Sequence, residues 1–130
     1  VLGLAALDAA LDIWDDVDMH DVRARSIELS ELFIDEVERR CPDLELASPR
    51  DPHARGSQVS FRFEHGYACM QALIEQGVIG DFRAPDGMSF GFTPLYIDHH
   101  DVLQAVAILE AILRDRLWDA PRFHLRAAVT

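Results

Sequence analysis

Residues 77–96, with the sequence GVIGDFRAPDGMSFGFTPLY, contain two short apolar runs separated by a turn. The apolar and aromatic residues of segments 78–83 and 88–92 predict two strands. The four residues between them are Ala84, Pro85, Asp86 and Gly87, and this composition is typical of a tight turn. Strands joined by so short a connection pair in antiparallel fashion. The segment therefore predicts a β-hairpin.

The segments around this hairpin contain four predicted helices. Apolar residues recur at helical spacing over residues 3–16, 19–40 and 65–76, and again after Asp98. Asp18 precedes the second of these helices and is a candidate N-cap, as Asp98 is for the last. The last helix has the cleanest periodicity, with an apolar stripe of Val102, Ala105, Val106, Leu109, Ile112, Leu113 and Leu117.

Two further strands precede the hairpin in the chain. Strict alternation over residues 58–63 predicts a half-buried strand, and residues 44–46 predict a shorter one. We expect residues 48–56 to form a loop and residues 119–130 to form a polar tail. Because the strands come in pairs with tight turns, we predict an α+β two-layer sandwich, in which helices cover a small, mostly antiparallel sheet.

The composition disfavours several classes of partner. The chain has 130 residues and a formal net charge of -11, from 23 acidic and 12 basic residues. We therefore expect no nucleic acid and no membrane as partners, because both phosphate backbones and anionic lipids attract clustered positive charge. No apolar run in the sequence approaches the roughly 20 residues that span a bilayer. Cys41 and Cys69 follow no metal or redox spacing, so we expect free thiols in a cytoplasmic protein.

All 12 basic residues are arginines, so the chain contains no lysine. Without a lysine it cannot form an internal Schiff base, and it cannot hold pyridoxal phosphate in the usual covalent way. It also lacks a Walker lysine and a GxGxxG loop, which disfavours a nucleotide-binding cradle. The sequence starts at Val1 in the middle of an apolar helical pattern, and we therefore expect a piece of a longer protein.

The histidines and acids of the chain give no convincing catalytic or metal site. Residues 98–101, DHHD, contain potential metal ligands, but neighbouring residues on a helix point in different directions. We interpret this segment as an acidic first helical turn and expect no metal. No serine, histidine and carboxylate form a recognisable nucleophile motif, so we expect no catalytic residue in this chain.

Arg83 is the candidate for a binding role, because it lies between the end of a predicted strand and the turn. One interpretation is a structural ion pair with Asp81, Asp86 or Glu64. The other is a guanidinium fork that binds a carboxylate or a phosphate, since its geometry suits both groups.

Three runs of sequence carry a family resemblance: GSQVSFRF (56–63), YACMQALIEQGVIGDFRAPDG (67–87) and FGFTPLY (90–96). They resemble the C-terminal part of bacterial kynureninases. The resemblance extends from VLGLAALDAALDIWDDV through SPRDPHARGSQVSF to RFHLRAAVT, and so covers nearly the whole chain.

The resemblance implies a homodimeric fold-type-I pyridoxal phosphate enzyme that hydrolyses kynurenine to anthranilate and alanine in tryptophan breakdown. It implies that a large domain outside this chain holds the cofactor, while the small domain closes over the substrate. We accordingly divide the chain into residues 1–17, a helix leading in from the large domain, and residues 18–130, the small domain. Alone, we expect the chain to bind no cofactor, to be inactive, and to self-associate through its N-terminal helix.

One position departs from the family pattern. The resemblance implies an arginine directly before the FGFTPLY-type run, and this arginine binds the α-carboxylate of the substrate. Ser89 occupies the position here. A serine offers one neutral hydrogen bond where an arginine offers a charged bidentate pair, so we expect weaker substrate binding. Arg83 remains a possible substitute from a different strand position.

Two other hypotheses remain open. In the first, the chain is a non-catalytic, stand-alone binding or assembly module that has kept the fold, which Ser89 and the absence of lysine both fit. In the second, it is the small domain of another fold-type-I enzyme, such as a cysteine desulfurase. The FRAPDG and FTPLY runs disfavour the second hypothesis.

Overall fold

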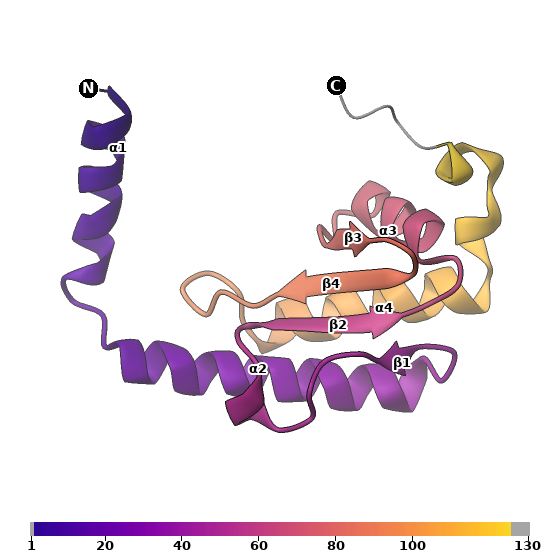
Figure 1. Cartoon of the computed structure of the whole chain (residues 1–130), viewed down its shortest axis with the longest axis horizontal. Coiled ribbons are helices and arrows are strands. Elements are labelled where there is room, and N and C mark those ends of the chain that lie inside the picture. The colour runs from indigo at the N-terminus through magenta and orange to yellow at the C-terminus, as the bar shows by residue number, and fades with distance from the viewer. Residues whose placement is uncertain (1, 126–130) are drawn as a thin grey trace.

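The computed structural model describes residues 2–125, so Val1 and residues 126–130 of the predicted tail lie outside the described residues. Within residues 2–125 the chain forms four α-helices, four strands and four short 3-10 helices (Figure 1). The α-helices are α1 (Leu2–Leu11), α2 (Met19–Arg40), α3 (Gly66–Glu75) and α4 (His99–Arg114). The strands are β1 (Glu45–Leu46), β2 (Gln58–Arg62), β3 (Asp81–Arg83) and β4 (Gly87–Gly91). The 3-10 helices are η1 (Asp12–Trp14), η2 (Pro52–Ala54), η3 (Leu117–Asp119) and η4 (Pro121–His124).

The described strands form one antiparallel sheet in the order β1-β2-β4-β3. Helices α2, α3 and α4 lie on one face of this sheet, behind it in the view of Figure 1. Their apolar side chains and alternate side chains of β2 and β4 form one core. Within it, the ring of Phe33 on α2 lies 6.0 Å from that of Phe61 and 5.0 Å from that of Phe90. The predicted α+β two-layer fold is confirmed.

The two long helices begin where their sequences predict. Asp18 accepts a hydrogen bond from the His20 N–H at 2.7 Å, and Asp98 forms a capping box with Asp101. Both caps satisfy backbone donors that the start of a helix leaves unpaired. The buried positions are Ser26, Leu29, Ser30, Phe33, Ile34 and Val37 on α2, and Val102, Val106, Leu109 and Ile112 on α4.

The hairpin is shorter than predicted on its first side, because residues 78–80 do not belong to β3. Gly77 has a φ of +86°, which glycine adopts without steric cost, and the chain changes direction there after α3. Gly80 then passes close to other groups. A Cβ added to it would lie 2.7 Å from the Cε of Met70 and 2.8 Å from the carbonyl oxygen of Ser89. Strand pairing begins only after this close passage.

The prediction of a polar tail is wrong for residues 119–125, the part that the structure describes. Just after α4, Arg116 adopts the left-handed conformation with a φ of 51°, and the chain turns back over α3. The short turns η3 and η4 then bury Trp118 and Phe123. Trp118 stacks on His65, with 4.1 Å between ring centroids. Leu117, which the predicted stripe placed on the core side, lies beyond α4 and is 44% exposed.

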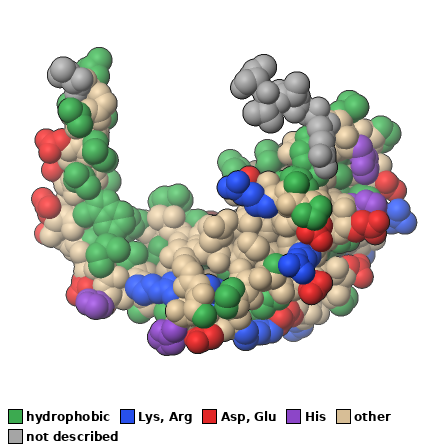
Figure 2. Space-filling view, in the orientation of Figure 1, with side chains coloured by type: hydrophobic (Ala, Val, Ile, Leu, Met, Phe, Trp, Pro, Cys, Tyr) green, Lys and Arg blue, Asp and Glu red, His purple; other side chains and the backbone are tan. Residues whose placement is uncertain are grey.

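The helix predicted over residues 3–16 is divided into α1 and η1, which extend away from the rest of the molecule (Figure 1). None of their described residues is buried. Their large apolar side chains are exposed, from 39% for Trp14 to 88% for Leu2, and Figure 2 shows hydrophobic side chains along this projecting arm. No helix within residues 2–125 is both long and apolar enough to cross a membrane.

A buried arginine fixes the loop between β1 and β2. The side chain of Arg55 is 3% exposed, donates to the carbonyl oxygens of Pro49 and Arg50, and forms an ion pair with Glu31. Arg23 of α2 donates to the carbonyl oxygen of Arg55 at 2.8 Å. The loop is thereby held against α2. Because it leads directly into β2, the same contacts fix where that strand begins.

We predict that Arg55→Ala lowers the free energy of unfolding by about 3 kcal/mol, because it removes buried, charge-assisted hydrogen bonds and leaves their acceptors unpaired. Arg50→Ala is the matched control from the same loop. Its side chain is 55% exposed and pairs with Glu38 at the surface, so we expect little change in stability. Urea denaturation of both variants measures the difference, and equal effects would contradict the role assigned to Arg55.

Candidate functional site

No helix or strand within residues 2–125 covers the face of the sheet that points away from α2, α3 and α4. Val59 and Phe61 on β2 and Met88 and Phe90 on β4 belong to the core, and because side chains alternate along a strand, the intervening residues lie on the opposite face. This open face carries Gln58, Ser60 and Arg62 on β2, Gly87, Ser89 and Gly91 on β4, and Asp81 and Arg83 on β3. Figure 2 shows it toward the viewer, with a centre made mostly of backbone and small polar side chains.

Strand register places three polar side chains in one row across the open face. Ser89 lies opposite Ser60 on one side and opposite Asp81 on the other. The hydroxyl oxygens of Ser60 and Ser89 are 2.8 Å apart and share a hydrogen bond, and Ser89 is only 5% exposed. Two hydroxyls carry two O–H donors, and the bond between them uses one. The pair therefore keeps one neutral donor for a ligand.

Two arginines lie in the neighbouring row. Arg62 of β2 and Arg83 of β3 both pair with Gly87 of β4, one on each side of it. Residues directly opposite one another in a sheet share a face, so both arginines lie on the open face. Arg83 pairs with Asp81 at 2.7 Å, with 76% of its side chain exposed. Asp81 is thus the partner found in the structure, out of the three that the sequence analysis considered for Arg83. Arg62 has no ion pair or hydrogen bond from its side chain within the described part of the chain.

The sequence analysis did not identify Arg62 as a site residue. The strict alternation of apolar and polar residues over 58–63 could have identified it, because this pattern puts Arg62 on the same face as Ser60. Same-face residues on one strand are separated by roughly 7 Å. The backbones of Arg62 and Arg83 therefore lie about that far from the row that contains Ser89. The open face thus offers a neutral donor at its centre and two guanidinium groups beside it, one of them already paired.

The remaining candidates from the sequence have structural roles. The backbone N–H groups of Asp101 and His100 donate to Asp98 and hold the pKa of its carboxyl below the usual value. Among residues 2–125, no group of three or more His, Cys, Asp or Glu side chains is arranged to hold a metal ion. Cys41 and Cys69 are free and buried, and burial raises their pKa values to about 11 and about 12. Both thiols therefore stay protonated at neutral pH and are poor nucleophiles.

The chain matches one family of known proteins. Residues 22–109 match the family model of the kynureninase C-terminal domain. The chain is 47% identical over 132 residues to kynureninases of Burkholderia mallei (strain SAVP1) and Burkholderia pseudomallei (strain K96243), and 46% identical to that of Pseudomonas fluorescens. These matches cover 100% of this chain and 32% of each relative, so the chain spans about a third of their length. The chain belongs to the kynureninase C-terminal domain family.

Proposed function

We propose that the chain is the C-terminal small domain of a kynureninase-like hydrolase, which cleaves kynurenine to anthranilate and alanine in tryptophan catabolism. The family match over residues 22–109 supports this most directly, together with a length about a third of that of the relatives. In this proposal the chain is inactive alone, and a large domain outside it supplies the chemistry. A reducing cytoplasm is the proposed compartment, and two free thiols are compatible with it.

The family uses pyridoxal phosphate in general, but the residues of this chain do not fit that cofactor. Covalent attachment of pyridoxal phosphate requires a lysine amine, and none of the 130 residues is a lysine. Binding of the cofactor therefore falls to the large domain. The role left to this chain is to bind and orient the substrate and to exclude water.

The open sheet face is the surface that we assign to the substrate. The Ser60–Ser89 pair lies near its centre and keeps one O–H donor for a substrate oxygen. Figure 2 shows a hollow between the projecting α1 and the rest of the molecule. A large domain seated in this hollow would cover the sheet face and bury the exposed apolar side chains of α1. Exposed apolar surface of this kind is typical of a protein interface.

The serine at position 89 determines how strongly we expect a carboxylate to bind. A hydroxyl gives one neutral hydrogen bond, whereas an arginine gives two charge-assisted bonds in a fixed geometry. The Ser89 hydroxyl is also hydrogen-bonded to Ser60. We therefore expect an enzyme assembled from this chain to bind the α-carboxylate of kynurenine weakly.

A non-catalytic, stand-alone binding or assembly module is the second candidate function. The Ser60–Ser89 hydrogen bond favours it, because each hydroxyl already takes part in a hydrogen bond without a ligand. The two candidates differ in one outcome. A small domain becomes active when it is joined to a cofactor-binding large domain, whereas an assembly module stays inactive.

Joining this chain to the large domain of Pseudomonas fluorescens kynureninase tests the substrate position. We predict that Ser89→Arg raises kcat/KM for kynurenine about tenfold or more, since a restored charged pair contributes at least about 1.4 kcal/mol to transition-state binding. The side chain at this position lies on the sheet face opposite the helices, beside Ser60 and Asp81. Steady-state kinetics of the two fusion proteins measure the effect.

Arg83→Ala in the same fusion protein is the comparison. Because the ion pair of Arg83 is exposed, we expect a loss of less than about 1 kcal/mol of stability and little change in kcat/KM. Flat activity in the Ser89→Arg variant, combined with lost activity and intact folding in the Arg83→Ala variant, would assign the carboxylate to Arg83 instead.

The exposed α1 predicts self-association of the chain when the large domain is absent. Leu4 and Leu7 are 73% and 55% exposed, and their burial between two copies removes apolar surface from water. We expect light scattering to show oligomers that Leu4→Glu disrupts. Leu103→Glu, at a 41% exposed apolar position on α4, is the control and should leave association unchanged. A monomer at high concentration would contradict the prediction.

A further inference from the structure

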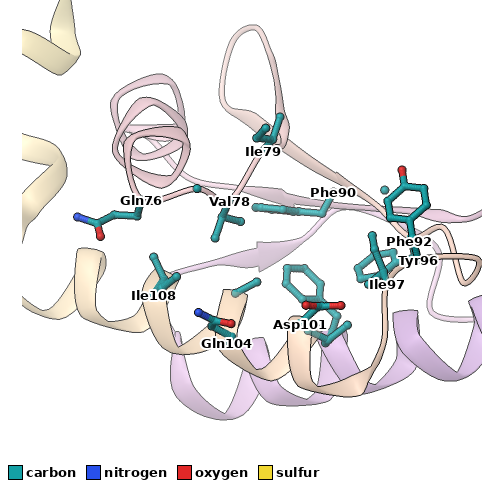
Figure 3. A pocket seen from close by; sticks show the side chains of 15 residues that line it. Gln76, Val78, Ile79, Phe90, Phe92, Tyr96, Ile97, Asp101, Gln104 and Ile108 are labelled. Atoms are coloured by element: carbon teal, nitrogen blue, oxygen red, sulfur yellow. The ribbon is translucent and has the colours of Figure 1, made fainter.

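Five segments line a pocket of about 370 Å³: α2, the residues after α3, the end of β4, the loop that follows β4, and residues 101–108 of α4 (Figure 3). This volume falls within the range of small-molecule sites, roughly 300–1,000 Å³. Neither Ser89 nor Arg83 lines the pocket, so the substrate role proposed above does not account for it.

The interior of the pocket is aromatic and its rim is apolar. Phe33, Phe90 and Phe92 line it, and the rings of the last two lie 5.0 and 5.2 Å from that of Phe33. At the rim, Ile79 and Tyr96 are 83% and 78% exposed (Figure 3). An occupant with a flat apolar body would bury this surface, and burial of apolar area is the dominant favourable term in such binding.

The charge in the pocket comes from Asp101, which is the one charged residue among the described side chains that line it. Its Oδ2 accepts a hydrogen bond from the Asp98 N–H at 2.9 Å, as part of the capping box. Its Oδ1 accepts no hydrogen bond within residues 2–125. Gln104, one turn further along α4, lines the same side (Figure 3). The pocket therefore combines an aromatic interior with a carboxylate oxygen that is free to accept.

We propose that this pocket binds a small alkylamine that carries an aromatic ring, in its protonated form. The ring packs against Phe90 and Phe92, and the ammonium group donates to Oδ1 of Asp101 in a charge-assisted hydrogen bond. The exposed ring of Tyr96 adds a favourable surface for a cation at the rim. The net charge of -11 raises the local concentration of cations and disfavours anionic ligands. Charge complementarity thus selects the amine over a carboxylate of the same shape.

Three probes that share one ring and differ in their polar group test the proposal: phenethylammonium, 2-phenylethanol and phenylacetate. Titration of the 130-residue chain is followed by amide chemical shifts in NMR. We expect phenethylammonium to bind with a dissociation constant of about 1 mM and to shift the amides of Ile79, Gly91 and Asp101. The neutral alcohol is expected to bind about fivefold more weakly, and phenylacetate to leave these amides unshifted.

Asp101→Asn removes the charge and keeps an acceptor for the Asp98 N–H, so α4 retains its cap. It should weaken phenethylammonium binding about fivefold and leave 2-phenylethanol unchanged. Asp21→Asn is the matched control, because Asp21 occupies the first turn of α2 and does not line the pocket. Ala105→Phe fills the pocket from α4 and should abolish binding of both probes.

The comparison of the three probes on the unaltered chain decides the proposal even where a variant fails to fold. Equal binding of all three probes would overturn the role of Asp101. Absence of shifts at Ile79, Gly91 and Asp101 with phenethylammonium, at concentrations well above its expected dissociation constant, would overturn the site itself.

Discussion

The register of β2 against β4 is the constraint on which the rest of the structure depends. Phe61 lies opposite Met88, and both side chains are fully buried between the sheet and its helices. Because side chains alternate along a strand, the same register puts Ser60 and Ser89 on the opposite face. A slip of one residue would move the aromatic side chains into water and bury the hydroxyls. The loop held by Arg55 fixes the start of β2 and so supports this register.

The unequal faces of the sheet follow from that register. One face is closed by α2, α3 and α4, while the other carries two hydrogen-bonded hydroxyls, glycines and two arginines. Beside it, α1 and η1 carry large apolar side chains that contact no core. A polar sheet face and an apolar helix are both uncovered within residues 2–125, which agrees with our proposal that a large domain covers them. A length about a third of that of the relatives agrees with this interpretation.

The elements that could be predicted are those with a local signal. The caps at Asp18 and Asp98 and the alternation over residues 58–63 determine most of α2, α4 and β2. The burial of Trp118 was missed, because it depends on stacking with His65 far earlier in the chain. Strand order is likewise non-local, so no pattern in the sequence placed Arg62 and Arg83 on the two sides of one glycine. Position 89 was identified by resemblance alone, and its bond to Ser60 required the structure.

One measurement tests directly whether a large domain covers the open sheet face, as we propose. Arg62→Cys places a thiol on this face, while Cys41 and Cys69 are buried with raised pKa values and react slowly. Maleimide labelling is timed in the chain alone and in the fusion with the Pseudomonas fluorescens large domain, with Asp35→Cys on the exposed side of α2 as reference. If the face is covered, position 62 labels rapidly in the chain and much more slowly in the fusion, whereas position 35 labels alike in both. If position 62 labels at the same rate in the chain alone and in a folded fusion protein, the proposal that the large domain covers this face is wrong.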